Sequence, residues 1–372
     1  MFELLQTSPR SRARLGRLNT TRGTIDTPVF MPVGTQASVK ALDLRELKEI
    51  GTEILLGNTY HLFLRPGMDI IRKAGGLHTF MNWDKPILTD SGGFQVYSLA
   101  KIRSVRDDGV EFRSHLSGET LFLGPRESMA IQRELGSDIA MLFDECPPHG
   151  CSADELESAV KRTLDWAAIC AEQPRAEGQF YFGIVQGANS PELRRRCAEE
   201  LVAMDFDGYA VGGVSVGEPE PEMMHAVEIT EPYLPENKAR YAMGLGTPAQ
   251  LVELVARGID MFDCVLPTRN ARNAQAFTRS GRMNLKNAKF AEDDAPIDAS
   301  CDCATCTGGY SRAYIRHLLN ASESMAGSLV ATHNLRHFQR LMLDIRQAIR
   351  DNDWSAFRAG WPGLRTDLAP LS

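Results

Sequence analysis

Long hydrophobic runs are absent from this 372-residue sequence. No apolar stretch approaches the roughly 20 residues that a transmembrane helix needs. The first residues, MFELLQTSPRSRARLGRL, contain no hydrophobic core followed by a small-residue cleavage site, so they do not form a secretory signal. With 43% hydrophobic and 24% charged residues, the composition is that of a folded globular protein. We therefore expect a cytoplasmic protein that does not associate with membranes.

Positive charge is also scarce: 41 Lys and Arg stand against 48 Asp and Glu, for a formal net charge of −7. Such a balance argues against a protein that coats nucleic acid through general attraction to phosphate. One segment departs from it, because residues 264–291 contain no Asp or Glu. We call its cations the basic strip: Arg269, Arg272, Arg279, Arg282, Lys286 and Lys289. On charge pattern alone, a solvated surface loop and a phosphate-binding strip both stay open.

Cysteine is sparse, with eight residues of which five are scattered along the chain. The other three form the cluster Cys301-x-Cys303-x-x-Cys306. Disulfides are uncommon in a reducing cytoplasm, so metal binding explains this cluster better. A tetrahedral Zn²⁺ ion needs a fourth ligand, and four protein ligands with no open position would make the ion structural.

Three downstream histidines could supply the fourth ligand: His317, His333 and His337. We expect His333, because it stands just before a long helix predicted around residues 336–354 and could turn back toward the thiolates. His337, one helical turn later, is the alternative.

Eight short apolar runs recur along the chain, each ending in polar or glycine residues: 28–34, 53–60, 86–93, 139–145, 180–187, 208–214, 240–246 and 261–267. Runs of this length and composition are typical of strands buried on both faces, as in a parallel sheet. Amphipathic stretches separate them, and the clearest follows a capping box formed by Ser152 and Glu155. Strands alternating with helices predict a (β/α)8 TIM barrel of the α/β class.

Two additions to the barrel are expected within a single domain that covers residues 1–372. Residues 1–27 alternate and turn without helical periodicity, which predicts an N-terminal antiparallel β cap. Residues 275–345 hold part of the basic strip and the cysteine cluster, so we expect a zinc-binding subdomain inserted after the eighth strand and before the last barrel helix.

Polar side chains and glycines follow the predicted strands at the end where barrel enzymes carry their chemistry. These residues are Asp90, Asp144, Gln186, Gly212, Gly213, Gly246 and Asp263. A single aspartate at a strand end is more often a helix cap than a catalyst. Three carboxylates converging on one mouth favour a catalytic site.

Several motifs, spread along nearly the whole chain, resemble those of the tRNA-guanine transglycosylases. The motifs that carry the resemblance, besides the cysteine cluster and its histidine, are TDSGGFQVYS (89–98), FDEC (143–146), VQG (185–187), GGVSVGE (212–218), MGLGTP (243–248) and FDCVLPTRNARN (262–273). The resemblance implies a covalent ribose intermediate on Asp263 and a general acid/base role for Asp90. It also implies that Cys301, Cys303, Cys306 and His333 bind one structural zinc ion.

The same resemblance implies a pocket that reads and encloses the base. Base-reading groups would be Asp144, Gln186 and the Gly213 backbone N–H, with stacking from Phe94 and Met243, and Ser91, Cys146 and Val216 in the same pocket. Arg269 and Arg272 would hold the anticodon stem-loop of the tRNA, and the remaining basic strip would contact its phosphates. This chain departs from the family's pattern at Ala274, where the family usually has glycine.

Physical chemistry agrees with these implied roles. Replacing a base with retention at the sugar requires two inversions, and hence a covalent intermediate on a carboxylate. Guanine offers N1–H and N2–H₂ as adjacent donors, which match a carboxylate such as Asp144, whereas adenine has an acceptor at N1. Its O6 needs donors, which Gln186 and a backbone amide can supply.

Within the family, Cys146 and Val216 resemble the bacterial pocket, which accepts preQ1 rather than the bulkier queuine. The resemblance therefore implies exchange of guanine at the wobble position of tRNAs for Asp, Asn, His and Tyr, by a homodimer. Two alternatives stay open: a barrel glycoside hydrolase, which would not explain the cysteine cluster, and a non-catalytic tRNA-binding subunit. The presence of both Asp90 and Asp263 argues against the latter.

Overall fold

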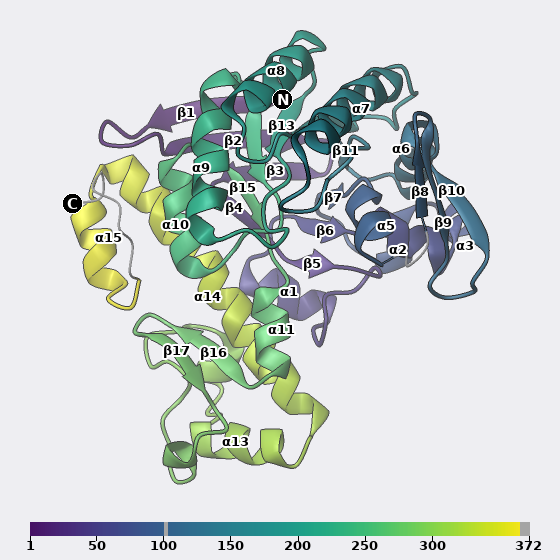
Figure 1. Cartoon of the computed structure of the whole chain (residues 1–372). Coiled ribbons are helices and arrows are strands. Elements are labelled where there is room, and N and C mark those ends of the chain that lie inside the picture. The colour runs from purple at the N-terminus through teal and green to yellow at the C-terminus, as the bar shows by residue number, and fades with distance from the viewer. Residues whose placement is uncertain (100–102, 365–372) are drawn as a thin grey trace.

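A closed parallel barrel forms the centre of the computed structural model, which describes residues 1–99 and 103–364 (Figure 1). Its strands pair in the order β4-β15-β14-β13-β12-β11-β7-β6-β5. They are β4 (Val29–Met31), β5 (Val33–Gly34), β6 (Leu55–Gly57), β7 (Ile87–Thr89), β11 (Ile139–Met141), β12 (Phe180–Val185), β13 (Gly208–Val211), β14 (Ala239–Ala242) and β15 (Met261–Asp263). Every one of the eight predicted apolar runs contains a barrel strand, so the predicted α/β barrel is confirmed.

The first predicted strand is divided at Pro32 into β4 and β5. The two halves pair with different neighbours, because β4 lies beside β15 and β5 beside β6, both in parallel. Proline cannot donate to a sheet ladder, so the interruption falls where the chain passes from one neighbour to the other. This exchange closes the ring.

Successive strand residues face two different hydrophobic cores. In β11, Ile139 and Met141 belong to a core that includes Ile184 and Met261 from other barrel strands. Ala140, between them, packs in the larger core that includes the residues of the surrounding helices. Because both faces are buried, the strands carry almost no polar side chains until their ends.

Helices cover the outside of the barrel. Those between barrel strands are α1 (Leu44–Ile50), α2 (Thr59–Leu64), α3 (Met68–Ala74), α4 (Leu77–Met81), α5 (Gly93–Leu99), α6 (Pro125–Leu135), α7 (Ala153–Ala171), α8 (Pro191–Ala203), α9 (Glu220–Thr230) with the 3₁₀ turn η1 (Glu231–Tyr233), and α10 (Pro248–Ala256). The capping box predicted before α7 is confirmed: Ser152 Oγ accepts from the Glu155 amide at 3.3 Å, and the Glu155 carboxylate accepts from the Ser152 amide at 2.9 Å. None of the helices in the described part of the chain is long and apolar enough to cross a membrane.

The antiparallel N-terminal cap is also confirmed. It comprises β1 (Phe2–Thr7), β2 (Arg14–Thr20) and β3 (Gly23–Thr27), paired in that order. Phe2, Leu18 and Ile25 pack in the same core as the barrel-facing strand residues. The cap therefore continues the interior of the barrel at the end opposite to the expected site.

A second antiparallel sheet was not predicted. It comprises β8 (Arg103–Arg106), β9 (Gly109–Arg113) and β10 (Thr120–Leu123), inserted between α5 and α6 (Figure 1). β8 and β9 mix charged with apolar residues, and β10 adds only the short segment TLFL, so the three strands differ from the longer apolar runs that mark the barrel strands.

After β15, the chain forms the region that contains the cysteine cluster, and then the last barrel helix. Its elements are α11 (Leu266–Arg272), the hairpin β16 (Gln275–Thr278) and β17 (Gly281–Asn284), η2 (Ala288–Phe290), α12 (Ala304–Thr307), α13 (Arg312–Asn320), α14 (Ser324–Asp351) and α15 (Trp354–Gly360). The long helix predicted around residues 336–354 begins earlier than expected, and His333 therefore lies inside α14 rather than before it. Since α14 passes through position 345 without a break, the predicted subdomain boundaries stay predictions.

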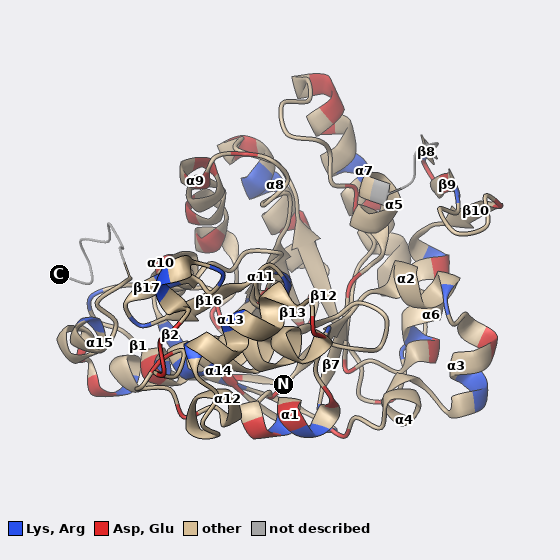
Figure 2. Cartoon of the chain, turned by 90° about the horizontal axis from the view of Figure 1, so that it is seen from below, with Lys and Arg blue, Asp and Glu red and all other residues tan. Residues whose placement is uncertain are grey.

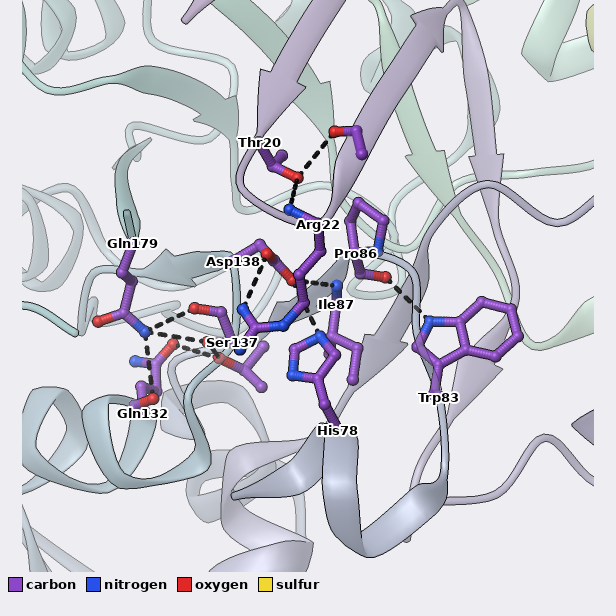
Figure 3. A network of polar contacts seen from close by, with 12 residues as sticks. Thr20, Arg22, His78, Trp83, Pro86, Ile87, Gln132, Ser137, Asp138 and Gln179 are labelled. Atoms are coloured by element: carbon purple, nitrogen blue, oxygen red, sulfur yellow. Dashed lines mark hydrogen bonds and ion pairs between the residues drawn. The ribbon is translucent and has the colours of Figure 1, made fainter. Parts of the chain in front are cut away.

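A buried carboxylate at the cap end of the barrel joins three elements (Figure 3). Asp138, just before β11, accepts hydrogen bonds from the Ile87 amide at 2.8 Å and from His78 Nε2 at 3.1 Å. Its other oxygen accepts from Arg22, in the turn between β2 and β3, at 3.2 Å. The Asp138 side chain is fully buried, whereas that of Arg22 is 38% exposed. The carboxylate thus fixes the cap and α4 to the strand starts.

Asp138→Ala should lower the free energy of unfolding by about 3 kcal/mol, because it leaves buried donors without an acceptor. Arg22→Ala is the matched control and should cost less than about 1 kcal/mol, since this half of the pair is solvated. Urea unfolding of the two variants measures the difference. Equal losses would contradict the role assigned to the carboxylate.

Candidate active site

A cavity of about 640 Å³ opens at the carboxyl ends of the barrel strands. All three predicted carboxylates, Asp90, Asp144 and Asp263, line it. The other predicted pocket residues that line it are Ser91, Phe94, Cys146, Gln186, Gly213, Val216 and Met243. The structure therefore brings every predicted base-site residue together.

Asp90 follows the last residue of β7 and is held from the start of α2. Its carboxylate accepts a short hydrogen bond from Asn58 Nδ2 and a 2.8 Å bond from the Thr59 amide. Burial raises the pKa of Asp90 to about 6, against the opposing effect of these two hydrogen bonds, and the charge of Asp263 adds to the rise. A carboxyl group with this pKa can both give and take a proton near neutral pH.

Asp263 is the last residue of β15, and two groups from the β14 end bond the same carboxylate oxygen. The Tyr241 hydroxyl donates to Oδ1 at 2.5 Å, and the Gly244 amide donates to it at 2.8 Å. Burial raises the pKa of Asp263, while both hydrogen bonds favour the ionised form. Neither of these two donors engages the second oxygen, Oδ2.

Four of the groups that hold these carboxylates were missed by the sequence reasoning: Asn58, Thr59, Tyr241 and Gly244. Two of them carried a usable signal, because Asn58 and Tyr241 are polar residues inside predicted apolar runs. A polar side chain in a strand buried on both faces needs a partner, and here the partners are the carboxylates.

Asp144 follows β11 and pairs with Gln186 at the end of β12. Gln186 Nε2 donates to Asp144 Oδ2 at 2.7 Å, and Ser91 Oγ donates to Oδ1 at 3.1 Å. Burial raises the pKa of Asp144 to about 6, opposed by the hydrogen bonds from Gln186 and Ser91. A carboxylate, which accepts hydrogen bonds, and an amide, which can donate them, thus lie side by side. Such a pair can bind a planar ring that carries donors and acceptors on adjacent atoms.

Glycines allow the backbone to approach this pair. A Cβ at Gly212 would lie 2.8 Å from Gln186 Nε2, and one at Gly213 would lie 2.5 Å from Gln186 Oε1. Gly213 also has φ of +62°, in the left-handed region. Any side chain at either position would therefore displace Gln186.

Phe94, Cys146, Val216 and Met243 form apolar parts of the cavity wall. Phe94 is 43% exposed and lines the cavity, so part of its surface is accessible there. Cys146 is buried, and burial raises the pKa of its thiol to about 12, so it is a neutral wall residue and not a nucleophile.

Lys and Arg positions, blue in Figure 2, include the basic strip, and its members differ in whether they line the cavity. Arg269 lines the cavity, and Arg272 is exposed near the end of the same helix, α11. Arg279 instead donates to Asp344 at 3.1 Å and lies over the Trp361 ring. The remaining members are exposed: Arg282, Lys286 and Lys289.

A group of four potential metal ligands lies beyond the barrel mouth. The ligand atoms of Cys301, Cys303, Cys306 and His333 all lie within 4.8 Å of one another. His333 Nδ1 is 3.3 Å from Cys306 Sγ and 3.7 Å from Cys303 Sγ. This confirms that the predicted residues converge.

The surroundings of this group fit a metal ion. His333 Nε2 lies 2.6 Å from the Phe277 carbonyl oxygen, which fixes the ring with Nδ1 directed at the thiols. Hydrogen bonds from Cys301 and Cys306 lower the pKa of Cys303, which favours the thiolate. The alternative histidines are elsewhere: burial lowers the pKa of His337 to about 3 in an aromatic core, and His317 is exposed on α13.

His333→Ala should lower the bound metal to well below one ion per chain, because it removes one of four ligands. His317→Ala, which exchanges an exposed histidine of the same region, is the control and should retain the metal. Inductively coupled plasma mass spectrometry of the purified proteins measures the content. Full occupancy in the His333 variant would place the fourth ligand elsewhere.

Position 274, where the family usually has glycine, has a left-handed backbone conformation that glycine adopts readily. Ala274 has φ of +62° and is buried, between α11 and β16. The methyl group therefore occupies a left-handed position, at a cost of roughly 1 kcal/mol. It touches none of the carboxylates described above.

Several buried carboxylates that line the mouth of a (β/α)8 barrel indicate an enzyme, and paired carboxylates are typical of enzymes that act on glycosidic bonds. Comparison with known proteins agrees: the sequence profile of the family described as queuine tRNA-ribosyltransferase matches residues 9–363. The chain belongs to this family, as its motifs indicated, and is a pentosyltransferase.

Relatives named queuine tRNA-ribosyltransferase match nearly the whole chain. The protein from Natranaerobius thermophilus is 55% identical over 358 residues, which cover 96% of each chain. That from Moorella thermoacetica is 56% identical over 350 residues, 94% of each chain. That from Halalkalibacterium halodurans is 54% identical over 358 residues, 96% of this chain and 94% of the relative.

Proposed function

We propose that this protein is a tRNA-guanine transglycosylase of queuosine biosynthesis. It exchanges guanine at the wobble position of tRNAs for Asp, Asn, His and Tyr with preQ1. The observation that carries the proposal is the convergence of Asp263, Asp90 and the Asp144–Gln186 pair on one cavity. Family membership supports the same reaction.

The chemistry begins with Asp263. Its free oxygen attacks the anomeric carbon of the ribose, the glycosidic bond breaks, and guanine departs with the bonding electrons. Asp90 supplies a proton to the departing base and later accepts one from the incoming base. Attack of the new base on the ribose–Asp263 ester restores the original configuration and releases the carboxylate.

Base recognition falls to Asp144, Gln186 and the Gly213 backbone. Ionised Asp144 accepts from guanine N1–H and N2–H₂, and Gln186 with the Gly213 amide donates to O6. Gln186 Nε2 donates to Asp144 Oδ2, and this bond orients the two side chains relative to one another. Phe94 and Met243 stack on the extruded base.

The pocket size favours preQ1 over queuine. Cys146 and Val216 both line the cavity, and Val216 also borders a small neighbouring pocket behind Gly213. The Val216 side chain thus separates the base site from this neighbouring pocket. A small aminomethyl substituent fits in front of this wall, whereas a bulkier one meets it.

Zinc is the metal proposed for the Cys₃His group, because three thiolates and an imidazole match its tetrahedral preference. With four protein ligands it is structural and would tie α12 to α14. Arg269 and Arg272 bind the anticodon stem-loop, and the exposed basic strip contacts its phosphates. We further propose a cytoplasmic homodimer.

Radiolabelled guanine should enter unmodified tRNA-Tyr in the presence of the protein. Excess preQ1 should block incorporation, and the same excess of queuine should not, because of the wall at Val216. Counts in the precipitated tRNA measure both results. Binding of tRNA without incorporation would identify a non-catalytic subunit, and equal competition by queuine would contradict the assigned base.

Asp263→Asn should abolish the covalent tRNA–protein adduct seen on denaturing gels, because an amide cannot form the ester. The variant should still bind tRNA with nearly wild-type affinity in a gel-shift assay, since Asn is isosteric and keeps the bonds from Tyr241 and Gly244. An adduct that survives would move the nucleophile to another carboxylate.

A further inference from the structure

Arg194, to which the sequence assigned no role, is fully buried behind the base-reading side of the cavity. It is the fourth residue of α8. Burying a cation is costly, and a cation in the first turn of a helix also opposes the positive end of the helix dipole. Burial lowers the pKa of Arg194 to about 10, so the side chain is still charged at neutral pH. A position this costly needs a compensating role.

Its hydrogen bonds fix the turn that carries Gln186. Arg194 Nη1 donates to the Val185 carbonyl at 2.8 Å, and Nε donates to the Ala188 carbonyl at 2.8 Å. These carbonyls flank Gln186 and Gly187 in the sequence. The turn is strained, because Ala188 has φ of +46° although it is not a glycine. The guanidinium therefore holds an unfavourable backbone that directs Gln186 into the cavity.

The third nitrogen of the guanidinium, Nη2, lies near Gly213. Arg194 Nη2 is buried and has no hydrogen-bond partner within the described part of the chain, and the same holds for Gln186 Oε1. A Cβ built on Gly213 would lie 3.5 Å from Nη2 and 2.5 Å from Oε1. A buried donor and a buried acceptor thus share the space behind Gly213.

We propose that Arg194 is a positioning residue for base recognition, which fixes the turn that carries Gln186 and packs behind Gly213. The inference rests on the proposed function, since it takes Asp144 and Gln186 as the base-reading pair. Gln186 links Asp144 to the guanidinium side of the wall, because its Nε2 donates to Asp144 while its Oε1 lies near Gly213, as Arg194 Nη2 does. A cation beside an amide oxygen polarises the amide and strengthens the bond donated by its N–H.

Other titratable groups near the pair are accounted for. Glu145 faces Asp144 but is paired with Arg162, and Glu218 near Arg194 accepts from the Ser215 and Val216 amides. Burial raises the pKa of three neighbouring thiols to between about 11 and about 12, and they stay neutral: Cys146, Cys170 and Cys197. Asp90 in the same cavity also has a pKa of about 6, so the test must remove it.

The test is guanine affinity, measured by calorimetry between about pH 5 and pH 8 in an Asp90→Asn background. Affinity should fall below about pH 6, because protonated Asp144 no longer accepts from N1–H. Adding Arg194→Met should weaken binding about tenfold at neutral pH and raise the midpoint by about one pH unit, since Asp144 loses the well-placed Gln186 hydrogen bond that lowers its pKa. Arg194→Lys should restore neither the affinity nor the midpoint in full, because one ammonium cannot make both hydrogen bonds of the guanidinium fork.

Arg195→Met is the matched control, since Arg195 is the neighbouring residue on α8 and pairs with Glu199 at the surface. It should leave affinity and midpoint unchanged. A lower melting temperature of Arg194→Met with an unmoved midpoint would overturn the inference, as would wild-type affinity. Should this variant fail to fold, Arg194→Lys decides: weakened binding supports the inference, and unchanged binding overturns it. Absence of guanine binding before Arg194 is changed would instead refute the proposed function.

Discussion

Closure of the barrel depends on a single interrupted strand. Because β4 and β5 pair with different neighbours on either side of Pro32, the parallel sheet runs around the barrel and returns to the same segment of the chain. Closure buries both faces of each strand, so polar side chains are restricted to the strand ends. That restriction places Asp90, Asp144 and Asp263 at one mouth and Asp138 near the other. Site and scaffold follow from the same geometric condition.

Burial then determines what the carboxylates at the mouth can do. It raises the pKa of Asp90, Asp144 and Asp263, and the local hydrogen bonds oppose it to different extents. Asp263 accepts from a tyrosine hydroxyl and a backbone amide, which favour the ionised form that the proposed nucleophile needs. The nearby charge of Asp263 adds to the rise in the pKa of Asp90, as suits the proposed acid/base group. Three chemically identical side chains thus acquire different environments from their neighbours.

The sequence predicted the barrel strands because each lies in a short, mostly apolar run, a pattern that can be recognised without knowing the tertiary structure. It also predicted that the carboxylates converge, since parallel strands end at one edge. It did not predict β8–β10, which are short and in part charged like many surface loops, or the start of α14 at Ser324. Partners such as Tyr241 and Arg194 were missed because their importance lies in what they touch, and contacts between distant residues leave no local pattern.

The helix α14 has a consequence for how this architecture can change. It carries the potential metal ligand His333, and further along it Gln339 donates to the Phe30 carbonyl at 3.1 Å and Arg346 donates to the Asp26 carbonyl at 2.5 Å. One continuous helix is therefore shared by the candidate metal site and by the wall and cap of the barrel. The region of the cysteine cluster cannot be exchanged between proteins as an independent module, and substitutions that reshape it are constrained by the packing of the barrel.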